Sequence, residues 1–140
     1  MKPQNIFGAQ RLGCVAEVEH TREIAARGTS AEAGKFSTER LRYQKEPMEA
    51  LTDPLVGEVI MQWGAQLGKT EILLNTIGYF VDAQPAPMLC VYPTLDTARK
   101  FSQKKLAQMI HETACLTNKV KDPRTRDSGN TILSKDFPGG

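Results

Sequence analysis

Gly64-Ala65-Gln66-Leu67-Gly68-Lys69-Thr70 is the most informative stretch of this 140-residue sequence. A short apolar run, residues 59–63, precedes it and favours a buried strand. Apolar residues at helical spacing follow it: Leu73, Leu74, Ile77, Phe80 and Val81. A turn between a strand and a helix exposes backbone N–H groups beside the positive end of the helix dipole, and together these bind phosphate oxygens. The stretch therefore predicts a phosphate-binding loop.

Two side chains of this loop suit the chemistry of a nucleotide site. We expect Lys69 to reach the outer phosphates and the Thr70 hydroxyl to coordinate Mg²⁺. The usual pattern requires glycine at position 63, where this chain has Trp63, so Gly64 gives a loop one residue shorter. An ordinary turn that opens a helix is the alternative explanation of these residues.

The rest of the chain alternates between strand-like and helix-like segments. Residues 88–92 form a second continuous apolar run, which is typical of an interior strand of a parallel sheet. Thr94 can cap a following helix, in which apolar residues recur over residues 95–110. Residues 131–135 alternate weakly, as a strand does, after a turn at residues 127–130. This order predicts an α/β fold with a parallel sheet and flanking helices.

The N-terminal part of the sequence, up to about residue 44, is polar and interrupted by glycines. We interpret it as an arm or loop with one weak helix between residues 17 and 26. A short helix is expected over residues 39–51, where Pro47 must lie in the first turn or bend the helix.

Phosphoryl transfer also requires carboxylates, normally at the end of a later buried strand. Beyond Lys69, only Asp82 follows an apolar run, and it lies too close to the loop to end a separate strand. We therefore assign Asp82 to the end of the helix that follows the loop. The catalytic carboxylates are missing from the sequence by this reasoning.

Two further groups of residues admit a functional and a structural explanation. Gln44 could pair with the edge of adenine, with Tyr43 or Arg42 stacked on the base, or the three could form an exposed polar helix face. Residues 97–126 contain eight Lys and Arg but only two acidic residues. That segment could contact a nucleic-acid backbone or be a solvated helix face.

Composition limits the class of protein. The net charge is +2 and 40% of the residues are hydrophobic, which is typical of a globular domain. No apolar run approaches the roughly 20 residues of a membrane span, and residues 1–10 lack a signal-peptide pattern. Cys14, Cys90 and Cys115 suit reduced thiols, so we expect a cytoplasmic protein without structural zinc.

Residues 28–140 resemble the ATPase part of tailed-bacteriophage terminase large subunits of the lambda type. Blocks that match in order cover about four-fifths of the chain. They are Ser30 to Phe36, Glu46 to Pro54, Gly64 to Glu71, Asn75 to Phe80, Pro85 to Leu89, Tyr92 to Thr94, and Arg126 to Thr131 with Lys135 to Gly140.

The resemblance implies a P-loop NTPase-type parallel sheet, of which residues 28–140 would be the N-terminal portion, while residues 1–27 remain an unassigned N-terminal arm. It implies that ATP and Mg²⁺ bind at the loop, at Glu71 and at Gln44. In that scheme Lys69 and Thr70 are catalytic, Thr70 coordinates the magnesium ion and Gln44 recognises adenine. The implied partners are double-stranded DNA, the terminase small subunit and the portal or prohead, in an oligomer of phage or prophage origin.

The resemblance further implies a motor that hydrolyses ATP to translocate DNA and cuts concatemers with a separate nuclease. The family's acidic Walker B strand, coupling motif and nuclease domain have no counterpart in this sequence, so we expect weak nucleotide binding and essentially no turnover by this chain. The N-terminal half of a helicase-type DNA translocase and a non-enzymatic DNA-binding protein are the alternatives.

Overall fold

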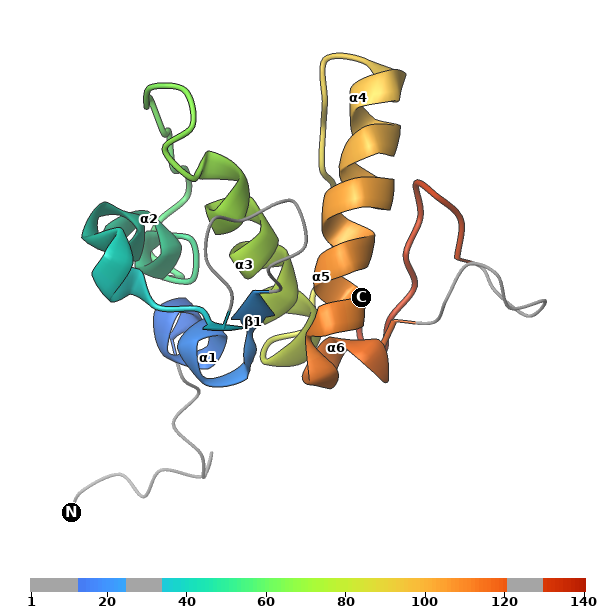
Figure 1. Ribbon diagram of the computed structural model, residues 1–140, viewed down its shortest axis with the longest axis horizontal. Helices are drawn as coiled ribbons and strands as arrows, with labels where there is room; N and C mark the ends of the chain where they lie inside the picture. Colours follow the sequence, from blue (N-terminus) through green and yellow to red (C-terminus); the bar gives the residue numbers. More distant parts are fainter. Residues whose placement is uncertain (1–12, 25–33, 121–129) are drawn as a thin grey trace.

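The computed structural model describes residues 13–24, 34–120 and 130–140, and most of their regular structure is helical (Figure 1). In chain order the elements are α1 (Cys14–Thr21), β1 (Glu23–Ile24), β2 (Gly34–Lys35), the 3₁₀ turns η1 (Thr38–Arg40) and η2 (Arg42–Gln44), α2 (Lys45–Ala50), α3 (Lys69–Asp82), α4 (Leu95–Lys100), the π-helical segment η3 (Phe101–Leu106), α5 (Ala107–Glu112) and α6 (Ala114–Thr117).

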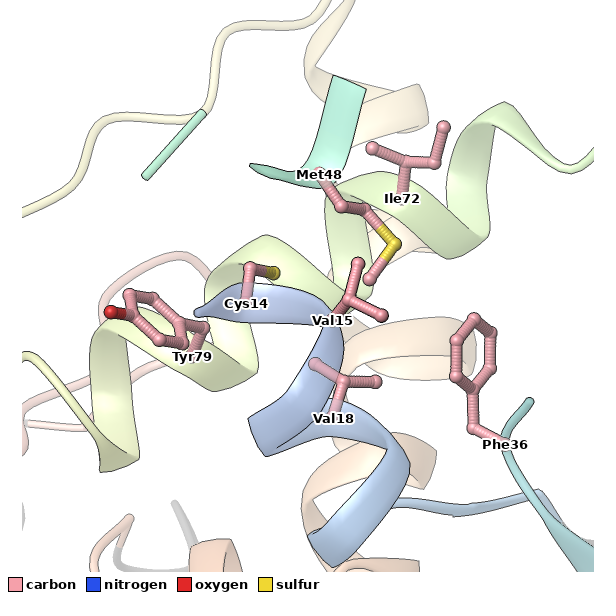
Figure 2. Packing of buried hydrophobic residues seen from close by; sticks show 7 residues of the cluster. All are labelled: Cys14, Val15, Val18, Phe36, Met48, Ile72 and Tyr79. Carbon is pink, nitrogen blue, oxygen red and sulfur yellow. The ribbon is translucent and has the colours of Figure 1, made fainter. Parts of the chain in front are cut away.

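Helix α3 lies between two groups of helices and buries side chains on two faces. On one face, Ile72 and Tyr79 pack with residues of α1, with Met48 of α2 and with Phe36 (Figure 2). On another face, Leu74, Ile77 and Val81 belong to a second apolar cluster. That second cluster is completed by Met109 of α5, Leu116 of α6 and Val120. The helix after the loop is therefore fixed by packing from both sides.

The second predicted helix is confirmed as one continuous rod made of α4, η3 and α5 (Figure 1). Thr94 caps it as expected, since its side-chain oxygen accepts a hydrogen bond from the Thr97 N–H at 3.2 Å. Asp96 lies in the first turn and pairs with Lys100 at 2.5 Å.

The predicted parallel sheet is not found in the described parts of the chain. There, β1 and β2 are the strands that pair, antiparallel, with Glu23 opposite Lys35. Residues 59–63 and 88–92 form neither helix nor strand, and neither belongs to a ladder. A strand needs a neighbour for its backbone N–H and C=O groups, and neither segment has one among the residues described. Some side chains of both segments stay in solvent, since Ile60 is 81% exposed and Leu89 88%, whereas Met61 and Trp63 pack against the first apolar cluster.

The strand expected at residues 131–135 is also wrong. The Thr131 N–H donates to the Ser134 carbonyl at 2.9 Å, and its hydroxyl accepts from the Ser134 N–H at 3.0 Å. Local bonds of this kind close a turn, because a Thr side chain offers the backbone an alternative to a sheet partner.

The helices expected before the loop form with shifted bounds. The first, expected at residues 17–26, is α1 at Cys14–Thr21. The second, expected over residues 39–51, is divided into η1, η2 and α2, and Pro47 lies in the first turn of α2 as predicted. The turn at residues 127–129 and the domain boundary after residue 27 lie outside the described residues.

Candidate functional site

The loop of residues 64–70 connects residues 59–63 to α3, and two of its residues have a positive φ. Gln66 has a φ of 58° and Gly68, the N-cap of α3, a φ of 77°. A Cβ at Gly68 would lie 2.3 Å from the Gln44 Nε2 atom. The left-handed backbone and the approach of the Gln44 amide therefore both favour glycine at position 68.

The loop backbone presents free donors. Among the described residues, no backbone N–H from Gly64 to Thr70 donates a hydrogen bond to the protein, whereas those of Glu71 and Ile72 bond to the Gly68 carbonyl. A row of unused N–H groups at the start of a 14-residue helix has the chemistry of an anion site. The donor set and the glycine at position 68 both fit a bound phosphate.

The two side chains expected to act at the loop are both exposed, and Lys69 lies across it. Its Nζ donates to the Trp63 carbonyl at 3.1 Å and to the Gly64 carbonyl at 2.6 Å. Thr70 follows in the first turn of α3. The structure thus places the Lys69 ammonium group at the start of the loop and Thr70 exposed at the start of α3.

The 3₁₀ turn η2 packs against the loop although it lies some 24 residues earlier in the chain. The Tyr43 hydroxyl donates to the Leu67 carbonyl at 3.2 Å, and Gln44 Nε2 donates to the Gly68 carbonyl at 3.3 Å. The Tyr43 ring meets Trp63 edge to face at 5.0 Å between centroids. Gln44 is 1% exposed, so it lies beside the loop as a buried support of its backbone.

Glu71, which the sequence placed with the loop, points elsewhere. Its Oε2 atom accepts a hydrogen bond from Arg22 at 2.7 Å. Sequence reasoning missed Arg22, because a single arginine in a polar segment carries no spacing signal.

Asp82 is the last residue of α3, as expected from the sequence. It pairs with Lys119 at 2.6 Å. A 14-residue helix is about 20 Å long, so this carboxylate lies far from the loop at the helix start. Nowhere in residues 13–24, 34–120 and 130–140 do three or more His, Cys, Asp or Glu side chains gather as metal ligands would.

The basic segment at residues 97–126 is only partly described. Arg99 and Lys104 are exposed on the rod. Lys100 and Lys119 are engaged in ion pairs with Asp96 and Asp82. Lys121, Arg124 and Arg126 lie outside the described residues.

A family model for the ATPase domain of the phage terminase large subunit gpA matches residues 30–140. The match includes the loop, η2 and the rod, but not α1. Comparison with curated proteins and with solved structures found no match. None of the helices in the described residues is long and apolar enough to cross a membrane.

Proposed function

Because the chain belongs to the phage terminase large subunit gpA ATPase-domain family, which supports a role as a DNA-packaging motor ATPase, we propose that the loop of residues 64–70 binds the phosphates of ATP together with Mg²⁺. The observation that carries this proposal is the row of backbone N–H groups from Gly64 to Thr70, none of which is used by the described residues of the protein. A phosphate requires such donors, and the first turn of α3 adds its dipole.

Each residue of the proposed site has a separate task. The N–H groups of Gly64, Ala65, Gln66, Leu67 and Gly68 donate to phosphate oxygens. Lys69 leaves the carbonyls that it now contacts and neutralises the outer phosphates. Thr70 offers its hydroxyl to Mg²⁺, which supplies charge neutralisation at the phosphates when bound.

The adenine contact that we propose involves Gln44 and Tyr43. Gln44 is buried and bonded to the Gly68 carbonyl. Recognition of the base therefore requires the Gln44 amide to turn away from Gly68, whereas Tyr43, 44% exposed beside the loop, can offer its ring without rearrangement. Glu71 has no direct contact with nucleotide in this proposal, because its carboxylate faces Arg22.

In the intact motor, we propose that ATP hydrolysis drives double-stranded DNA into a prohead and that a nuclease cuts concatemers. The small subunit, the portal and an oligomeric assembly are the corresponding partners. Arg99 and Lys104, exposed on the rod, are our candidates for contacts with the DNA backbone.

Calorimetric titration of the chain with Mg-ATP tests the proposed site. We expect Lys69→Ala to weaken binding about tenfold or more, since a charged hydrogen bond to phosphate contributes roughly 1.5–3 kcal/mol. Lys104→Ala is the matched control, because it removes the same charge from the rod, and it should bind as the wild type does. Equal affinities for the wild type and Lys69→Ala would refute the proposal.

DNA binding without nucleotide is the second candidate function, and the exposed Arg99 and Lys104 favour it. If this function is correct, the affinity for DNA depends on salt and is the same with and without ATP. It should also be unchanged in Lys69→Ala and lower in Lys104→Ala.

A further inference from the structure

Arg22 is a buried arginine in a part of the chain that precedes the family match. It is the C-cap of α1, eight positions before residue 30, and its side chain is 8% exposed. Its backbone is fixed on both sides, since its N–H donates to the Val18 carbonyl and its carbonyl accepts from the Phe36 N–H. A charge buried in this way is costly unless it has partners.

The partners of Arg22 lie on the first turns of α3. One terminal nitrogen donates to Glu71 Oε2 at 2.7 Å and the other to Asn75 Oδ1. The guanidinium also lies over the Phe36 ring, 5.6 Å from its centroid. A planar fork that holds two acceptors fixes the direction of both, which a lysine cannot do.

These two acceptors connect Arg22 to the start of α3 and, through Asn75, to Met48 of α2. Glu71 follows Thr70 directly in the first turn of α3. Asn75 is fully buried and its Nδ2 also contacts the Met48 sulfur of α2, the helix that continues from Gln44. The arginine therefore holds the start of α3 and the segment that supports Gly68 in one arrangement.

The charge of Glu71 gives this arrangement a functional consequence. A carboxylate in the first turn of α3 lies close to the place where phosphates would bind, and like charges at this range repel. Arg22 turns the Glu71 side chain toward α1 and neutralises it.

We propose that Arg22 is a positioning residue for the nucleotide site: it neutralises Glu71 and orients the first turn of α3, so that the loop of residues 64–70 accepts phosphate at full affinity. This inference rests on the proposed function, and it makes α1, outside the family match, part of the site.

The experiment is calorimetric titration with Mg-ATP of the wild type, Arg22→Met, Arg22→Met/Glu71→Gln, Glu71→Gln and Lys69→Ala. Thermal unfolding of each variant fixes a temperature at which it is folded, and urea unfolding at that temperature measures its stability. Lys119→Met is the matched control, because it breaks the ion pair at the other end of α3.

We expect Arg22→Met to raise the Kd about tenfold, because an uncompensated carboxylate is left beside the phosphates. Removing that carboxylate in the double variant should restore most of the affinity, although the double variant unfolds more readily than the wild type. Glu71→Gln should bind no more weakly than the wild type, and Lys119→Met should bind equally well. If the role of Arg22 is purely structural, both Arg22 variants lose stability, but the Kd does not rise in Arg22→Met and recover in the double variant.

Each contrary result has a distinct meaning. If Lys69→Ala weakens binding but Arg22→Met does not, the inference about Arg22 is wrong and the proposed function stands. If Arg22→Met does not fold, Glu71→Gln decides: binding as weak as in Lys69→Ala would mean that Glu71 itself serves the ligand, which overturns the inference. If the wild type binds no Mg-ATP, both the proposed function and the inference fail.

Discussion

Replacing Gly68 with alanine tests the geometry of the loop most directly. The backbone at Gly68 has a φ of 77°, a left-handed conformation that costs an L-residue roughly 1–2 kcal/mol. The added Cβ would also meet Gln44 Nε2 at 2.3 Å, so the Gln44 side chain has to move. Because Gln44 is 1% exposed, its displaced amide stays buried without its present partner.

The magnitude follows from these two effects. Leaving a buried amide unsatisfied costs about 1–3 kcal/mol. The smaller conformational freedom of alanine in the unfolded chain returns roughly 0.4–1 kcal/mol. We therefore expect Gly68→Ala to lower the free energy of unfolding by about 2–4 kcal/mol and to weaken Mg-ATP binding as well.

Urea unfolding followed by circular dichroism measures the change. Gly57→Ala is the matched control, since a Cβ there meets no atom within 4 Å and the backbone is not left-handed, and it should change stability by no more than about 0.5 kcal/mol. In a Gln44→Ala background the cost of Gly68→Ala should fall, because the clash is gone. A Gly68→Ala variant as stable as Gly57→Ala, or a cost unchanged by Gln44→Ala, would refute the reasoning.

Two further predictions concern the N-terminal half. The Thr38 hydroxyl and N–H both donate to Glu19 and lower the pKa of its carboxyl below the ordinary value of 4.5. Glu19 therefore stabilises the fold fully above that ordinary value, and its contribution is lost as the pH falls through the lowered pKa. Acid unfolding curves should show the wild type losing more stability below that pH than Thr38→Val, and parallel losses would contradict the assignment. Burial, assisted by the Glu49 carboxylate, raises the pKa of Cys14 to about 12, whereas Cys90 is exposed. Mass spectrometry should find iodoacetamide on Cys90 long before Cys14 in the folded chain, and equal rates would show that Cys14 is accessible.

The parts of the fold that sequence predicted well are those with local causes. Helix α3 follows from apolar spacing after a glycine, and the rod follows from the Thr94 cap and the acid in its first turn. Each depends on residues within a few positions of one another. For the same reason Asp82 was placed correctly at the end of α3.

The predicted sheet depended on something that local patterns do not contain. Residues 59–63 and 88–92 have the apolar character of buried strands, but neither forms a strand in the structure. Pairing, however, requires a neighbouring strand at the right distance, and apolar runs do not say which segment supplies it. In the described structure Val91 is 81% exposed, so an apolar run alone was not evidence of burial.

The sequence predicted where the loop lies relative to the following helix, but it did not predict the long-range contacts around it. The loop, Lys69 and Thr70 lie at one helix start, as the sequence indicated. The contacts of Gln44 and Arg22 bridge some 24 and 49 positions of the chain. No spacing rule connects residues so far apart, and only the packing of the N-terminal elements brings Gln44 to the loop and Arg22 to the first turns of α3.

The contacts of Lys69 with the Trp63 and Gly64 carbonyls have a consequence for the timing of ligand entry. These two oxygens occupy two of the three ammonium donors, so a phosphate that has docked gains the full ammonium group only when the carbonyls are released, and docking and full engagement are separate events. Stopped-flow traces should therefore show an observed rate that reaches a plateau as nucleotide concentration rises, with the plateau set by the release of Lys69.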